Sequence, residues 1–233
     1  MYESVHAAPD GERSVAWLVE TASEYGFDGV VLRTRSDARS DADLASIADE
    51  VGVDVVDGVE IRAKRPQEAS GTVGNARTSH TIVAVEGGTP ALNRFAVENE
   101  KVDVLARPMA GEGDFNHVLA KAAVENGVRI EFDFGPVLRT SGGRRVRTLQ
   151  SMRKLGEIVD YYDAPYVVTA GVRSHLQFRG PRELCAVGAL IGFDREWVES
   201  GLREWGRLAE RNRHVTSRGF VEPGVHEGRY EDR

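Results

Sequence analysis

The sequence predicts a single α/β domain that folds as a TIM-barrel-like (β/α) barrel with about seven parallel strands. Apolar runs rich in valine and isoleucine alternate with helix-period segments, which is the pattern of βα units. The chain has 233 residues, 41% of them hydrophobic, which suffices for one sizeable core. No repeat, linker or low-complexity block divides it. Because no GxGxxG motif follows the first strand, a closed barrel lacking one regular unit is favoured over an open nucleotide-binding sheet.

The expected strands are short apolar runs, of which the first is weak. They lie at residues 2–6, 27–32, 53–56 or onward to 61, 81–85, 102–106, 128–134 and 166–169. The expected helices alternate with them and show apolar residues at helical spacing. They lie at about residues 12–25, 41–51, 90–99, 115–126, 144–162, 182–191 and 195–213.

Residues typical of helix starts and ends support these boundaries. Thr89 before Pro90 forms a helix start, and Asn126 with Gly127 suits a helix end. The connection 58–79 shows no clear helix and is predicted to be a long loop, of the kind that is often functional in a compact domain. We therefore expect a barrel over residues 1–215 and an irregular C-terminal tail over 216–233.

The composition indicates a soluble, cytoplasmic protein without a membrane segment. No apolar run approaches the roughly 18 residues that a membrane helix needs. The first residues, MYESVHAAPDGE, lack the pattern of a secretory signal. The sole cysteine, Cys185, has no partner for an internal disulfide, and its apolar surroundings predict a buried, inert thiol.

Charge is distributed unevenly along the chain. The net charge is −7, which by itself disfavours a nucleic-acid partner, but residues 1–60 hold 4 basic and 14 acidic groups, whereas residues 139–182 hold nine basic and three acidic. Of the 30 basic residues 26 are arginine. This bias resembles proteins of salt-loving archaea, where short bidentate anion contacts survive screening, and it fits equally well a GC-rich genome.

Catalytic patterns are weak. The six histidines form no HxH or HxxxH pair, and no serine lies in a GxSxG turn. Glu131 and Asp133 alternate with apolar residues near the end of a strand, so both carboxylates face one side. Pairing with arginines inside the barrel mouth is favoured for them over proton transfer. A metal-dependent phosphoesterase that uses these two acids, or a barrel isomerase acting on a small molecule, remains the alternative.

The most informative segment is SGGRRVRTLQSMRKLGEIVDYY, residues 141–162. Its apolar residues from Val146 to Tyr162 recur every three or four positions, which predicts a helix with one buried stripe. Arginines crowd its first turns and acidic residues its last turns, an order that opposes the helix macrodipole. Free N–H groups, Gly142, Gly143 and guanidinium forks together predict a phosphate cradle, with a solvated face or ion pairs as the alternative.

Other basic residues extend this predicted RNA-binding surface. The full set is Arg139, Arg144, Arg145, Arg147, Arg153, Lys154, Arg173, Arg179 and Arg182. A second arginine stripe, at 203, 207 and 211, is better explained by intrahelical pairs such as Glu199 with Arg203. Because no aromatic residues interleave with these arginines, recognition of the backbone and shape of folded RNA is favoured over base stacking.

Several stretches resemble the archaeal and eukaryotic ribonuclease P protein subunit family known in archaea as protein component 3. They are YGFDGVVLR at 25, GVEIRAK at 58, VEGGTPALNRFAVENEKVDVLARP at 85, DFNHVLAKAAVENGVRIEFDFGPVL at 114, RRVRTLQSMRK at 144 and PYVVTAGVRSHLQFRGPRELCAVGALIGF at 165. The family is similar in fold to the polymerase-and-histidinol-phosphatase group of metal-dependent hydrolases, with most metal ligands lost. Of those metal ligands, the first strand of this chain keeps only His6.

The resemblance implies a protein without catalytic residues or cofactor that binds and stabilises ribonuclease P RNA during 5′-end maturation of precursor tRNA. The RNA performs the cleavage, and the implied partners are that RNA, precursor tRNA indirectly, protein component 2 and the other small protein subunits. Carried over by motif, the family's basic helix falls on residues 144–154 and a further arginine on Arg173. Asn116, His117, Glu131 and Asp133 then take structural or subunit-facing roles. The acidic N-terminal third departs from more basic relatives.

Overall fold

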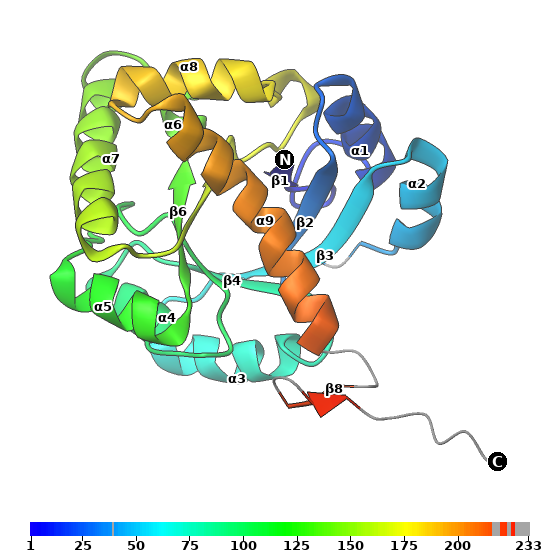
Figure 1. The fold of residues 1–233 in the computed structure, drawn as a ribbon, viewed down its shortest axis with the longest axis horizontal. Helices are drawn as coiled ribbons and strands as arrows, with labels where there is room; N and C mark the ends of the chain where they lie inside the picture. The colour runs from blue at the N-terminus through cyan, green and yellow to red at the C-terminus, as the bar shows by residue number, and fades with distance from the viewer. Residues whose placement is uncertain (39, 216–219, 223–224, 227–233) are drawn as a thin grey trace.

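Seven parallel strands form one nearly closed sheet in the computed structural model, which describes residues 1–38, 40–215, 220–222 and 225–226 (Figure 1). Sequence order and spatial order coincide from β1 to β7, which confirms the predicted barrel. The strands are β1 (Tyr2–Val5), β2 (Gly29–Arg35), β3 (Asp54–Ile61), β4 (Ile82–Glu86), β5 (Val104–Ala106), β6 (Arg129–Asp133) and β7 (Tyr166–Thr169).

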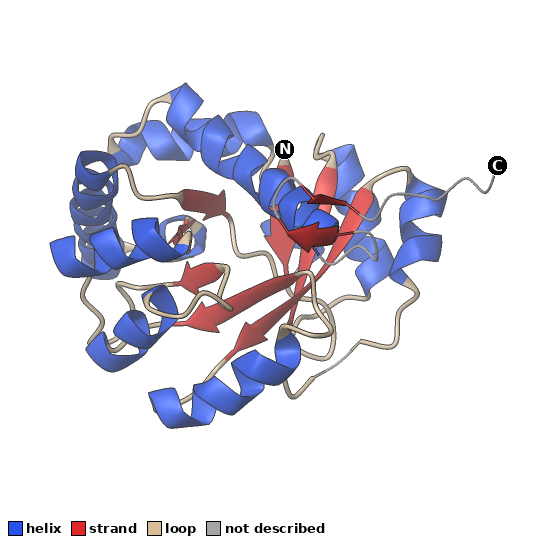
Figure 2. Cartoon of the chain, turned by 60° about the horizontal axis from the view of Figure 1, so that its bottom comes forward, coloured by secondary structure: helices blue, strands red, loops and turns tan. Residues whose placement is uncertain are grey.

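Helices surround the strands, as Figure 2 shows. They are α1 (Val15–Glu24), α2 (Leu44–Val51), α3 (Pro66–Ala76), α4 (Pro90–Val97), α5 (His117–Asn126), α6 (Gly135–Arg139), α7 (Gly142–Tyr162), α8 (Pro181–Ile191) and α9 (Arg195–Val215), with a 3₁₀ turn at His175–Gln177. The seven predicted helices are all present. Within 216–233, predicted to be irregular, β8 (Phe220–Glu222) and β9 (Val225–His226) pair antiparallel, and the remainder lies outside the described residues.

The prediction of a long loop at 58–79 was wrong. Its first residues complete β3, and α3 occupies most of the rest. Pro66 begins the helix, and only the small side chains of Ala69, Val73 and Ala76 are buried on it. Because α3 also contains two glycines with low helix propensity, the sequence carries little helical signal there, and packing against the sheet stabilises the helix instead. The short α6 was also missed.

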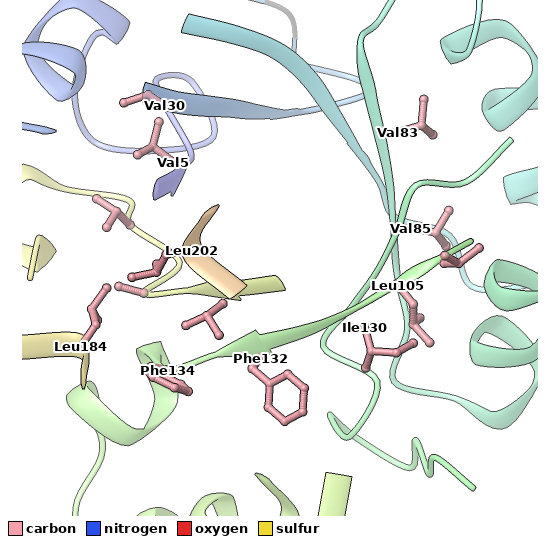
Figure 3. Close-up of a cluster of buried hydrophobic side chains, with 14 of the residues drawn as sticks. Val5, Val30, Val83, Val85, Leu105, Ile130, Phe132, Phe134, Leu184 and Leu202 are labelled. Atoms are coloured by element: carbon pink, nitrogen blue, oxygen red, sulfur yellow. The ribbon is translucent and has the colours of Figure 1, made fainter. Parts of the chain in front are cut away.

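Two hydrophobic layers hold the barrel together. The outer layer lies between the sheet and the surrounding helices, and Figure 3 shows part of it, including Val5, Val85 and Ile130. The inner layer fills the amino-terminal half of the barrel, where Trp205 of α9 packs against strand side chains such as Val31 and Val104. The indole N–H of Trp205 donates to the carbonyl of Val168 at 2.9 Å. Helix α9, which crosses the strands in Figure 1, thus closes this end of the barrel.

The seam between β1 and β7 is joined without a regular ladder. Val5 and Val172 form an isolated bridge, and the N–H of His6 donates to the carbonyl of Val172 at 2.8 Å. The buried carboxyl of Glu3 accepts the N–H of Ala170 at 3.0 Å across the same seam. Burial raises the pKa of Glu3 to about 8, although the hydrogen bonds that its carboxyl accepts from Thr169, Ala170 and Ser4 oppose the shift. Glu3 therefore holds a proton near neutral pH.

Replacing Glu3 with glutamine is expected to change how stability depends on pH. An acid whose folded pKa, about 8, exceeds its ordinary value of 4.5 binds more protons in the folded state over that interval. Its contribution to the wild-type free energy of unfolding therefore falls by about 1.4 kcal/mol per pH unit there, whereas glutamine does not titrate. Urea denaturation of both proteins at several pH values should show that the free energy of unfolding of the variant increases relative to that of the wild type as pH rises. A difference independent of pH would contradict this assignment.

Among the residues that the structure describes, none of the helices combines the length and the apolar character required to cross a lipid bilayer.

Candidate functional site: the barrel mouth and the arginine-rich helix

Charged side chains gather at the carboxyl ends of the strands, the end where α/β barrels place ligand sites. Strands β2, β3, β4 and β6 contribute Arg33, Glu60, Glu86 and Glu131 directly, and Arg107 follows β5. Because neighbouring parallel strands end together, residues far apart in sequence meet in this mouth. It contains more arginine than the sequence analysis anticipated.

Arg33 lies at the centre of the mouth and is only 2% exposed. Its two terminal nitrogens form ion pairs with the carboxylates of Glu60 and Glu131, on opposite sides. Burial alone would raise the pKa of the Glu60 carboxyl, but the charges of Arg33, His6 and Arg107 outweigh burial and hold that pKa well below its ordinary value. The Arg33–Glu131 pair confirms the predicted pairing of Glu131 with an arginine inside the mouth.

Arg62 and Arg107 extend the network around Arg33. Arg62 lies 2.7 Å from a carboxylate oxygen of Glu60 and 2.8 Å from one of Glu86. Arg107 lies 3.0 Å from each of the same two carboxylates. Arg62 also lies 3.6 Å from Asp10, whose pKa falls to about 2 because the hydrogen bond from His6 and the Arg62 charge outweigh the effect of burial. Each acid in the network thus has a cationic neighbour.

Positive and negative groups balance within this mouth. The two sets are the guanidinium groups of Arg33, Arg62, Arg107, Arg139 and Arg173, and the carboxylates of Asp10, Glu60, Glu86, Glu131 and Asp133. Asp133 differs from the others, because its Oδ1 accepts the N–H of Gly135 at 2.8 Å and no described cation pairs with it. The predicted arginine pairing therefore holds for Glu131 and not for Asp133.

A metal ion does not fit the donor set of this mouth. The one histidine in it, His6, already binds Asp10 through Nδ1 at 2.9 Å. The carboxylates of Glu60 and Glu131 are both engaged by Arg33, which lies between them and supplies a fixed positive charge. In the described part of the chain, no group of three or more His, Cys, Asp or Glu side chains could hold a metal ion.

Helix α7 begins beside the mouth and projects its first turns into solvent. It starts at Gly142, two residues earlier than predicted, and Gly142 adopts a φ of 57°, which favours glycine. Ser141 precedes it without a side-chain cap, and the first turn carries no acidic residue. Val146, predicted to belong to the buried stripe, is 52% exposed, because burial begins only near Met152. The start of α7 therefore has little contact with its own protein.

The nine predicted RNA-binding residues divide into two groups. The exposed residues Arg144, Arg145, Arg147 and Arg182 form no ion pair or side-chain hydrogen bond with any described residue. The others are engaged within the fold. Arg139 binds the carbonyls of Ala170 and Gly171, Arg153 those of Leu190 and Ile191, Arg179 those of Leu176 and Phe178, Lys154 binds Asp114, and Arg173 binds Asp10.

The arginine stripe of α9 forms the expected intrahelical ion pairs at two of its three positions, whereas Arg211 donates to the side-chain oxygen of Asn212 at 3.3 Å. Arg203 lies 2.6 Å from Glu199, and Arg207 lies 3.4 Å from Glu204. Arg195 joins the same helix face, 3.5 Å from Glu199. Arg195, Arg203 and Arg207 are exposed, like the arginines at the start of α7, but each has an acidic neighbour about one helical turn away.

Roles carried over from the family motifs are partly visible. The side chain of Asn116 caps α5, accepting the N–H of Val118 at 3.0 Å, and His117 stacks on Tyr162. Sequence reasoning missed Arg33, Arg62 and Arg107 altogether. The only feature of the sequence that could have identified them is their position. Each lies at or just beyond the end of an expected apolar strand, where α/β barrels carry polar side chains.

The fold and this mouth define an α/β barrel whose mouth is filled with arginine–carboxylate pairs. The fold is similar to that of histidinol phosphate phosphatase from Lactococcus lactis, with a TM-score of 0.54, 10% identity, and coverage of 82% of this chain and 94% of that one. A second solved structure, archaeal ribonuclease P with mature tRNA, contains a chain of the same fold, with a TM-score of 0.86, 24% identity and full coverage of both chains.

The chain belongs to the RNase P subunit p30 family, whose model matches residues 2–217. It is 56% identical to ribonuclease P protein component 3 of Halorubrum lacusprofundi, over 100% of this chain and 99% of the relative. The resemblance noted in the sequence is thereby confirmed.

Proposed function

We propose that this chain, as a ribonuclease P protein subunit, binds the catalytic RNA through the exposed arginines at the start of α7. One observation carries the proposal. Arg144, Arg145 and Arg147 are exposed and have no acidic neighbour among the described residues, whereas Arg33 in the mouth and Arg203 on α9 are paired with acids. Cations at a helix start oppose the macrodipole, so an external anion is the natural partner for them.

The phosphate backbone of folded RNA supplies that anion. Guanidinium groups contact phosphate oxygens in a bidentate manner, and the uncapped N–H groups at the start of α7 add neutral donors. Lys154 and Arg153 lie farther along the same helix but already bind within the protein, so they contribute less to this surface. Arg182, at the start of α8, is also exposed and forms no ion pair with any described residue. The proposal concentrates the binding energy in fewer residues than the nine predicted from sequence.

Neutralising phosphates on this surface would let the RNA compact, while the RNA performs the cleavage of precursor tRNA. Family membership and the likeness to an archaeal ribonuclease P chain support this assignment, with precursor tRNA, protein component 2 and the other subunits as further partners in the cytoplasm. No observation favours a phosphoesterase, because the carboxylate of Glu131 that it would use is bound by Arg33.

Reconstitution with ribonuclease P RNA and the partner subunits tests the proposal. The variant Arg144→Ala/Arg145→Ala/Arg147→Ala is expected to process precursor tRNA at least about ten-fold more slowly at subsaturating protein, because three phosphate contacts are lost. Raising the concentration of the variant should restore most of the rate, since the reacting groups belong to the RNA. A variant that processes precursor as well as the wild type at every protein concentration would reject the assignment.

A further inference from the structure

A cavity of about 460 Å³ lies between the start of α7 and the loop that follows β5. Its walls combine two kinds of side chain. One kind is apolar and comes from Pro108, Met109, Phe132, Pro136, Met152 and Leu155. Arg144 and Arg147 of α7 also line the cavity, with the hydroxyl residues Thr148 and Ser151 on the same helix. The cavity therefore joins an apolar space to the cationic surface described above.

The volume and the lining suit a flat heterocycle that carries an anionic group. Small-molecule sites in proteins typically occupy about 300–1,000 Å³ and have apolar walls with a few polar groups. Sequence-selective binding of RNA commonly uses unpaired bases that leave the stack and enter such spaces. Asp133 also lines the cavity, and its Oδ2 accepts no hydrogen bond from any described residue, so it can accept an amino or imino N–H.

Charge balance decides where the anionic group must lie. The mouth beneath the cavity has matched guanidinium and carboxylate groups, and Arg107 in its wall is shared between Glu60 and Glu86. Arg144 and Arg147 are the arginines of the lining that have no acidic neighbour among described residues. A phosphate is therefore attracted to the α7 side of the cavity rather than to its floor.

We propose that this cavity receives the base of one unpaired nucleotide of the bound RNA, while Arg144 and Arg147 hold the adjoining phosphate. The inference rests on the RNA-binding role proposed for α7 and adds a specific contact to it. It assigns Met152 and Leu155 to the base, and Asp133, Thr148 and Ser151 to its polar edge. The start of α7 then recognises a local feature of the RNA as well as its charge.

Filling the cavity tests this inference. Ser151→Trp places an indole inside the cavity, and Gln150→Trp, at the neighbouring exposed position outside the lining, is the matched control. Binding of the full-length variants to ribonuclease P RNA, to single-stranded RNA hexanucleotides of each base and to nucleoside monophosphates is measured by equilibrium titration. Thr148→Phe serves as a second filling variant if the thermal transition shows that Ser151→Trp does not fold.

We expect the filling variant to bind both the ribonuclease P RNA and the preferred hexanucleotide about ten-fold more weakly than the wild type, which corresponds to loss of one base contact. Gln150→Trp should bind as the wild type does. Unchanged affinity of the filling variant, or equal weakening by the control, would overturn the inference. So would a cavity that binds monophosphates but whose filling leaves RNA affinity unchanged. If the triple alanine variant alone loses RNA affinity, the cavity inference fails while the role of α7 stands.

Discussion

Replacing Arg33 with methionine is expected to lower the free energy of unfolding by about 3–5 kcal/mol, because removing one partner of a buried ion pair leaves an uncompensated charge. Here two carboxylates, Glu60 and Glu131, would lose the same guanidinium group. Methionine has a similar length and is apolar, so it fills much of the space without replacing the charge. Urea denaturation at constant salt measures the effect.

The control is Arg144→Met, an equal change at an exposed arginine. We expect its free energy of unfolding to stay within about 0.5 kcal/mol of the wild type. The double variant Arg33→Met/Glu131→Gln should recover part of the loss, because it removes one of the two stranded charges. A loss for Arg33→Met no greater than for Arg144→Met would show that the mouth network does not stabilise the barrel.

This contrast separates two uses of arginine in one chain. Arg33 is enclosed by the strands and neutralises acids that the barrel itself provides. Arg144 projects from the exposed first turns of α7, whose burial begins only near Met152. The high arginine content therefore has no single explanation, and the exposed, unpaired arginines are the ones that we propose bind RNA.

Most strands were predictable because both faces of a parallel sheet are buried, so a strand reads as a short run rich in apolar residues. The run at 27–32 shows this directly in β2. Helix α3 was not predictable in the same way, since its buried face consists of small residues such as Ala69 and Ala76. There the tertiary contact, and not the local sequence, determines the element.

The candidate site was predictable only in part. The crowding of arginines at 144–147 is local and visible in the sequence, but the exposure of Val146 depends on where α7 leaves the body of the protein. The mouth network depends on contacts that are distant along the chain. Arg33 meets partners 27 and 98 residues away, so no spacing rule could have paired them. Sequence alone likewise could not show that Arg153 binds carbonyls of α8.

The salt dependence of RNA binding should show a large difference between two sets of three arginines. Arg144→Ala/Arg145→Ala/Arg147→Ala removes exposed cations without acidic neighbours among the described residues. Arg195→Ala/Arg203→Ala/Arg207→Ala removes the same charge from exposed cations that are paired with Glu199 and Glu204. At moderate salt we expect the first variant to bind ribonuclease P RNA about 100-fold more weakly than the wild type, and the second less than about three-fold more weakly.

The slope of the logarithm of the binding constant against the logarithm of salt concentration tests the role of α7 most directly. Measured between about 0.2 and 1 M potassium chloride, it counts the phosphate contacts that a protein makes, at close to one unit for each. We predict that the α7 variant has a slope shallower by about two to three units than the wild type, whereas the α9 variant keeps the wild-type slope. Equal slopes for all three proteins would contradict binding of RNA phosphates by Arg144, Arg145 and Arg147.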